Sequence, residues 1–80
     1  MDKVEMFERA LAFGWLFFEG CENALVGYTV DLQPVYSHAK LLEVWIEKLK
    51  CEYHEAIDYV DQVFLGVHYE KKPIIIFDDL

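Results

Sequence analysis

The strongest constraint on the fold is an apolar repeat in the second half of the chain. Between residues 53 and 67, apolar side chains return every three or four positions, which is the period of one face of an α-helix. The spacing predicts a helix over residues 52–65 that buries one side, with Gly66 suited to end it. The members of the repeat are Tyr53, Ala56, Ile57, Val60, Val63, Phe64 and Val67.

Two further helices follow from similar patterns. Residues 2–12 form an amphipathic helix, in which Asp2 is the expected N-cap. Its apolar stripe consists of Val4, Phe7 and Leu11. Residues 38–50 form another helix with an apolar stripe, and Ser37 is placed to cap it.

The remaining apolar segments predict strands. Residues 24–30 and 35–36 are rich in β-branched and aromatic side chains, and a proline opens a strand at 73–77. The apolar run 15–18 fits either a strand or a continuation of the first helix, and we expect a short strand. Residues 78–80 read as a solvated tail.

This order of elements predicts a single α+β domain over residues 1–80. Eighty residues are enough for one domain with one core. Helices and strands that are not in regular alternation favour a small sheet covered by helices. We therefore expect an antiparallel sheet of three to four strands, packed on one face by about three helices.

The charge of the chain limits its partners. Fifteen acidic residues against seven basic ones give a net charge of −8. Such a chain is repelled by nucleic-acid phosphates and by anionic membranes, so we expect neither direct nucleic-acid binding nor membrane binding. No apolar run approaches the ~20 residues of a membrane span. A basic surface on a partner protein would be attracted, although the charge also serves solubility alone.

The aromatic content suggests an interface. Six Phe, five Tyr and two Trp are present in 80 residues. A monomer of this size hides only about 60–65% of its unfolded surface, so it can scarcely bury all thirteen rings. We expect some of them at an interface, and a homo-oligomer is the simplest case.

The sequence predicts no catalytic, metal or cofactor site. His38, His54 and His68 do not form a metal-binding motif, and Cys21 and Cys51 match neither a zinc nor a C-x-x-C spacing. Ser37, the only serine, lacks a G-x-S-x-G context. We therefore expect a protein that is not an enzyme, located in the cytoplasm with both thiols reduced.

Two groups of residues are candidates for partner binding. Glu52, Glu55, Asp58 and Asp61 recur every three residues on the strongest helix, where neighbours lie about 5–6 Å apart. They form either an ordinary solvated face or a surface for a basic partner, and a row of carboxylates at this spacing could also imitate DNA phosphates.

Tyrosines are the second candidate, because residues with an apolar ring and a polar tip are common in interface hot spots. Tyr36 and Tyr59 are the tyrosines we assign to partner binding, with Tyr53 and Tyr69 as further exposed aromatics. The alternative is that these rings are partly buried at the edges of the core.

Three stretches together resemble a family of small uncharacterised proteins of tailed phages. Residues 22–27 resemble the motif D-D-A-L-V-G, and residues 35–44 resemble V-Y-D-Y-E-K-C-I-E-I. Residues 53–66 resemble Y-E-E-A-V-E-Y-F-E-F-N-V-L-G, and residues 73–76 follow where the family has T-P-V-F-I. The resemblance implies a phage or prophage context, and hence a bacterial cytoplasm, but no catalytic residues.

Three hypotheses for function follow. The first is an acidic interaction protein of phage or prophage type that binds and modulates a host protein. The second is a DNA mimic that inhibits a host restriction or immune nuclease through its acidic face. The third is a self-assembling accessory protein.

Overall fold

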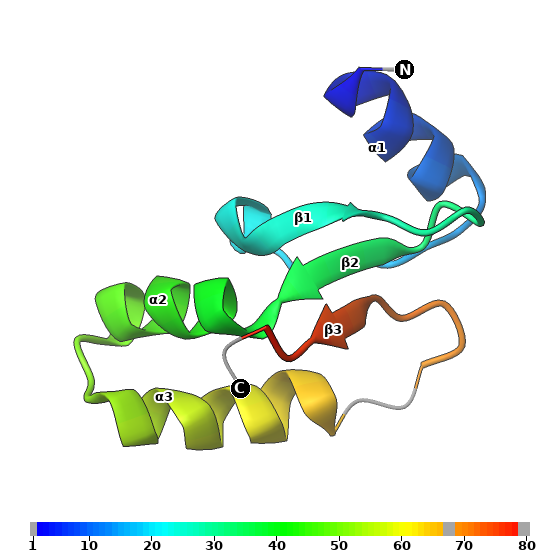
Figure 1. Ribbon diagram of the computed structural model, residues 1–80. Coiled ribbons are helices and arrows are strands. Elements are labelled where there is room, and N and C mark those ends of the chain that lie inside the picture. The colour runs from blue at the N-terminus through cyan, green and yellow to red at the C-terminus, as the bar shows by residue number, and fades with distance from the viewer. Residues whose placement is uncertain (1, 67–68, 79–80) are drawn as a thin grey trace.

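The computed structural model describes residues 2–66 and 69–78 and confirms the α+β fold (Figure 1). Three α-helices, a 3-10 turn, a π-helical turn and three strands follow one another along the chain. In order they are α1 (Lys3–Ala12), η1 (Glu22–Ala24, 3-10), β1 (Leu25–Tyr28), β2 (Pro34–Ser37), α2 (His38–Leu49), α3 (Tyr53–Val60), η2 (Asp61–Leu65, π) and β3 (Ile74–Ile76).

The predicted helix starts are confirmed, and each has a specific capping contact. The amide of Glu5 donates to Oδ1 of Asp2 at 2.9 Å, and the amide of Lys40 donates to Oγ of Ser37 at 3.1 Å. These bonds satisfy amides that have no partner inside the helix. In α3, Glu52 and Glu55 form a reciprocal capping box.

The helix predicted over residues 52–65 is present, but its last turn is wider than an α-helix. After Val60 the chain continues as the π-helical turn η2, in which the amide of Gly66 donates to the carbonyl of Asp61 at 3.1 Å. Gly66 caps this turn with an ordinary φ of −82° rather than the left-handed conformation common at helix ends. The change of period leaves Phe64 buried and Val63 exposed.

The three strands form a mixed sheet in the order β1-β2-β3, so the expectation of an antiparallel sheet is wrong for one strand pair. β1 pairs antiparallel to β2 through a hairpin, whereas β3 pairs parallel to β2. The reason is the connection: α2, α3 and η2 all lie between β2 and β3, and such a crossover lets the chain return in the same direction.

The strand expected at residues 15–18 is absent, and these residues are not helical either. The segment is held by single contacts instead of a ladder. The amide of Leu16 donates to the carbonyl of Lys71 at 2.8 Å, and the amide of Phe18 donates to the hydroxyl of Tyr36 at 3.0 Å. The apolar run 15–18 therefore correctly indicated that Phe18 packs against the core, but it did not indicate the secondary structure of the segment.

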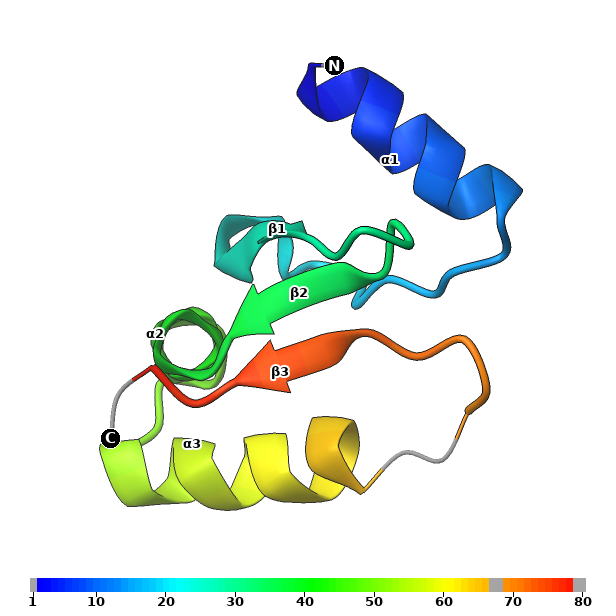
Figure 2. The same cartoon turned by 45° about the vertical axis from the view of Figure 1, so that its right-hand side comes forward.

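The core lies between the sheet and the α2–α3 pair (Figure 2). Phe18 connects the two sides, because its ring centroid is 4.7 Å from that of Tyr36 and 4.5 Å from that of Phe64. The buried members of this core are Cys21, Ala24, Tyr36, Leu41, Leu42, Ala56, Val60 and Phe64. Burial raises the pKa of the Cys21 thiol, and both cysteines are free.

Asp78 is exposed, as the predicted solvated tail requires, but hydrogen bonds attach its carboxylate to the start of α2. Its Oδ2 accepts a hydrogen bond from the buried hydroxyl of Ser37 at 2.6 Å, and its Oδ1 accepts one from the amide of Ala39 at 3.2 Å. These bonds lower the pKa of Asp78. Asp79 and Leu80, the rest of the predicted tail, lie outside the described residues.

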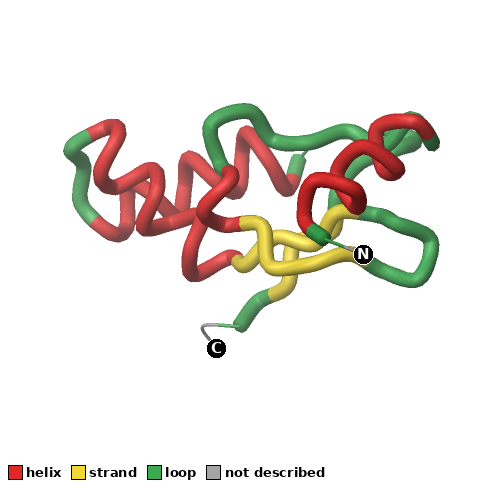
Figure 3. The backbone as a smooth tube through the Cα atoms, turned by 90° about the horizontal axis from the view of Figure 1, so that it is seen from above, coloured by secondary structure: helices red, strands yellow, loops and turns green. Residues whose placement is uncertain are grey.

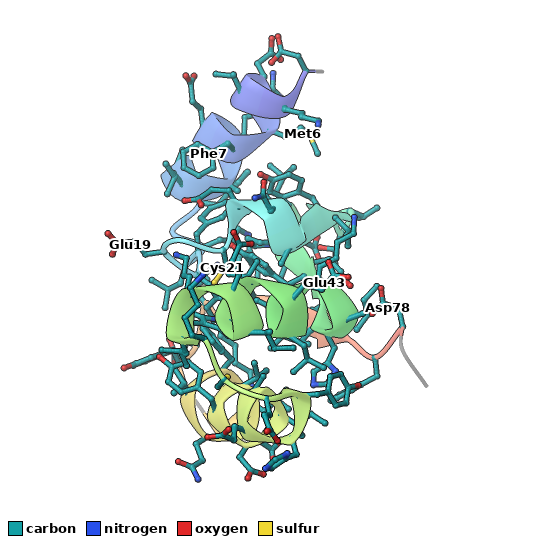
Figure 4. The ribbon with its side chains drawn as sticks, turned by 90° about the vertical axis from the view of Figure 1, so that its left-hand side faces the viewer. Met6, Phe7, Glu19, Cys21, Glu43 and Asp78 are labelled. Carbon is teal, nitrogen blue, oxygen red and sulfur yellow. The ribbon has the colours of Figure 1, made fainter. Side chains whose placement is uncertain are left out.

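Helix α1 does not join the other two helices. It lies beyond the β1 edge of the sheet, at the opposite end of the molecule from α3 (Figures 1 and 4). The view from above shows the same separation, with α1 beside the strands and away from the α2–α3 pair (Figure 3). Two helices rather than three therefore enclose the main core.

Candidate interaction surfaces

The acidic residues of α3 lie on its outer surface, as the sequence predicted. Glu52, Glu55, Asp58 and Asp61 are all exposed. Residues three apart on a helix differ in direction by about 60°, so from Glu52 to Asp61 the side chains turn through about half of the helix circumference. They form a broad acidic surface, not a straight row.

The first two of these carboxylates already have local roles. Oε1 of Glu55 accepts the amide of Glu52 at 3.2 Å, and Nδ1 of His54 lies 3.5 Å from Oε2 of Glu52. The three side chains could present one ligand atom each within 4.8 Å of one another. The capping box already accounts for the closeness of Glu52 and Glu55. The side chains of His54 and Glu52 are also highly exposed, at 72% and 77%.

Tyr36 is wrongly assigned to partner binding, because the structure places it inside the core. The residue is 1% exposed, its hydroxyl accepts the Phe18 amide, and burial raises its pKa to about 12. Successive side chains of a strand point to opposite faces of the sheet, and Tyr36 takes the face of β2 that packs on Phe18 in the core. A partner cannot reach this ring while the domain is folded.

Tyr59 lies at the border between the core and the acidic surface. Its ring centroid is 4.9 Å from that of Trp45 on α2, and the residue remains partly exposed. Glu55 is one helical turn before it on the same side of α3. Tyr59 can therefore contribute an accessible edge to a contact made by α3, while Tyr53 and Tyr69 are more open.

A second surface, at the opposite end of the molecule, was missed as a site by the sequence analysis. The apolar stripe of α1 does not pack into the core: Val4, Phe7 and Leu11 are 65%, 42% and 49% exposed. The buried residue of α1 is Ala10, whose side chain points about 100° away from that of Leu11 around the helix axis. The stripe therefore stays partly open to solvent, with Phe7 in contact with Phe17.

A groove of about 520 Å³ separates the first turns of α1 from β1. Its apolar walls are Val4, Met6 and Phe7 on one side and Leu25, Val26 and Tyr28 on the other. Figure 4 labels Met6 and Phe7 on α1. The ring centroid of Phe7 is 4.7 Å from that of Phe17, which lies 6.2 Å from that of Tyr28, so aromatic contacts link the two walls.

The signal that could have identified this groove was present in the sequence. A ten-residue helix is marginal in water unless its apolar side is covered. The chain also has more aromatic residues than an 80-residue core can hide. The sequence does not show, however, that the uncovered surface would be that of α1.

The chain matches no protein-family model, no curated protein and no solved structure. Across residues 2–66 and 69–78, none of the helices has the length and apolarity needed to cross a membrane. The two surfaces therefore have to be interpreted from their own chemistry.

Proposed function

We propose that the protein is an acidic, non-catalytic interaction protein that binds and modulates a host protein through a basic surface on that partner. The resemblance of residues 15–77 to a tailed-phage family supports a phage or prophage origin and a bacterial cytoplasm as the place of action. The partner would contact the outer surface of α3.

One observation carries this proposal: this part of the chain has exposed acidic residues but neither Lys nor Arg. Glu55, Asp58 and Asp61 are exposed on α3, and no Lys or Arg occurs between Lys50 and Lys71. Exposed carboxylates create a negative potential that speeds the approach of a basic partner and orients it.

The geometry supports a basic protein surface over DNA mimicry. From residue 52 to residue 61 the helix rises only about 14 Å, and its carboxylates turn away from one another as it does so. Duplex DNA presents two continuous strands of phosphates, with one charge per ~3.4 Å of axis on each strand. Lysines and arginines on a curved protein surface can instead meet a few carboxylates that point in several directions.

The test is a charge reversal with a matched control. The variant Glu55→Lys, Asp58→Lys, Asp61→Lys and the control Glu8→Lys, Glu19→Lys, Asp31→Lys change the net charge equally, and all six positions are exposed. Both are used as baits in a bacterial lysate, and the partner of the wild-type protein is then purified for a salt titration.

We expect the wild-type protein and the control to retain the same partner, and the α3 variant to lose it. Affinity should fall steeply as salt rises through the range where exposed charges become screened. Retention of the partner by the α3 variant contradicts the proposal. Competition by duplex DNA for the same site would instead support the nuclease-inhibiting mimic.

A further inference from the structure

The outer edge of β1 carries backbone groups that the sheet does not use. Gly27 pairs with Val35 of β2, and the amide of Thr29 donates to the carbonyl of Gln33 at 2.9 Å. Because alternate residues of an antiparallel strand direct their N–H and C=O groups to opposite sides, those of Tyr28 point away from β2.

Val26 adds an exposed apolar side chain to this edge. The pairing of β1 with β2 shifts between Leu25 and Gly27, so Val26 stays outside the regular ladder. In the part of the chain that the structure describes, β1 lies at one end of the sheet and has β2 as its only neighbouring strand. Such an edge is a template for another strand.

The groove beside α1 lies directly along this edge. Val26 and Tyr28 line it from the sheet, and Val4 and Phe7 line it from α1. Val4 and Val26 are 65% and 45% exposed, so the apolar walls can be reached from solvent. An edge strand that faces an apolar groove is the arrangement used to bind extended peptides, with hydrogen bonds from the backbone and alternate side chains in the groove.

The charged residues that line the groove indicate which kind of peptide it would bind. Residues 24–30 carry no charge, while Asp2 and Glu22 line the groove on either side and Lys3 is its one lining cation. The surplus of negative charge at the groove, on a chain of net charge −8, favours a ligand with a positive charge next to its apolar residues.

We propose that the protein binds an extended segment of a partner protein as an additional strand between β1 and α1, and that this segment combines alternating apolar residues with Lys or Arg. Its backbone would pair with Tyr28, and its apolar side chains would pack on Val4, Phe7 and Val26. This site is separate from the acidic surface of α3, so either proposal can fail without the other.

The position of α1 favours a single segment over the sheet edge of a second copy. α1 stands on the far side of the groove from β1, in the direction in which the sheet would grow (Figures 1 and 4). A second copy pairing through its own β1 would bring β2 and β3 behind that strand, into the region of α1. One isolated strand has no such extension.

The experiment is a selection from a random peptide library with the full chain as bait, followed by hydrogen exchange on the best peptide. We expect enriched peptides with alternating apolar residues and at least one Lys or Arg, and slower exchange at the amide of Tyr28. The variant Tyr28→Pro removes the outward amide, whereas Tyr28→Ala removes only the side chain. Binding should weaken about tenfold more in the proline variant.

Two further variants separate this site from the alternatives. Glu22→Lys should shift the selected peptides away from Lys and Arg, and the triple lysine variant of α3 should leave the selection unchanged. The proposal is overturned if no peptide is enriched, or if bound peptides protect amides elsewhere. It is also overturned if Tyr28→Pro and Tyr28→Ala bind equally, or if the Tyr28 amide becomes protected only as the chain itself dimerises.

Discussion

The two ends of the molecule use the same kind of amphipathic helix for opposite purposes. In the body of the protein, formed by the sheet with α2 and α3, the centres of the apolar stripes are buried, with Leu42 at 1% and Val60 at 0% exposure. In α1 the stripe stays largely open to solvent, with Val4 at 65% and Leu11 at 49%. Periodicity therefore identifies the side of a helix that needs a partner, but not whether that partner belongs to the same chain.

The largest expected effect is on the free energy of unfolding, and it tests whether the stripe of α1 is less well packed than that of α2. Leu42→Ala leaves a cavity in the core and should lower the free energy of unfolding by about 2–5 kcal/mol. Leu11→Ala removes the same atoms from an exposed position and should cost under about 1 kcal/mol. Urea unfolding of the two variants, followed by far-ultraviolet circular dichroism, measures both values. Equal losses would mean that the α1 stripe is as well packed as the body.

The elements of the body were predictable because their signals are local. The stripes of α2 and α3 and the caps at Ser37 and Asp2 depend on residues within one turn of each other. The parallel pairing of β3 depends on a long connection, and the sequence does not specify the direction in which such a connection returns. Tyr36 is buried against Phe18, which lies 18 residues earlier and whose amide donates to the Tyr36 hydroxyl.

The candidate sites were predictable to different degrees for the same reason. The acidic surface of α3 follows from the helical spacing of Glu55, Asp58 and Asp61, which are local to one element. The groove exists because α1 and β1 lie close together but leave a space between them. No sequence pattern within either segment encodes that arrangement. Asp78 was read as a tail residue because its partner, Ser37, is 41 residues away.

A second, smaller effect concerns the contact that holds residues 15–18 to the sheet of the body. Tyr36→Phe removes the acceptor of the Phe18 amide and leaves that partly buried donor without it. We expect a loss of about 1–3 kcal/mol in the free energy of unfolding. Tyr53→Phe is the matched control, because Tyr53 is 56% exposed, and it should change stability little. Similar values for the two variants would show that the Tyr36 hydroxyl has no role in the core.

The smallest expected effect on stability concerns the hydrogen bonds between Asp78 and the start of α2, and it depends on pH. Because the hydrogen bonds from Ser37 and Ala39 lower the pKa of Asp78 in the folded state, protonation occurs more readily in the unfolded chain. The ionised carboxylate therefore stabilises the fold above its unfolded pKa, and this contribution disappears as the pH falls through the lowered folded value.

Asp78→Asn should accordingly be less stable than the wild-type protein at neutral pH, and the difference should close in acid. Asp58→Asn removes the same charge from the exposed surface of α3, so it reports how the reduced net charge alone affects stability. Urea unfolding of the three proteins across this pH range separates the two contributions. A difference between Asp78→Asn and Asp58→Asn that stays constant with pH would show that the carboxylate at residue 78 does not hold the end of β3 to α2.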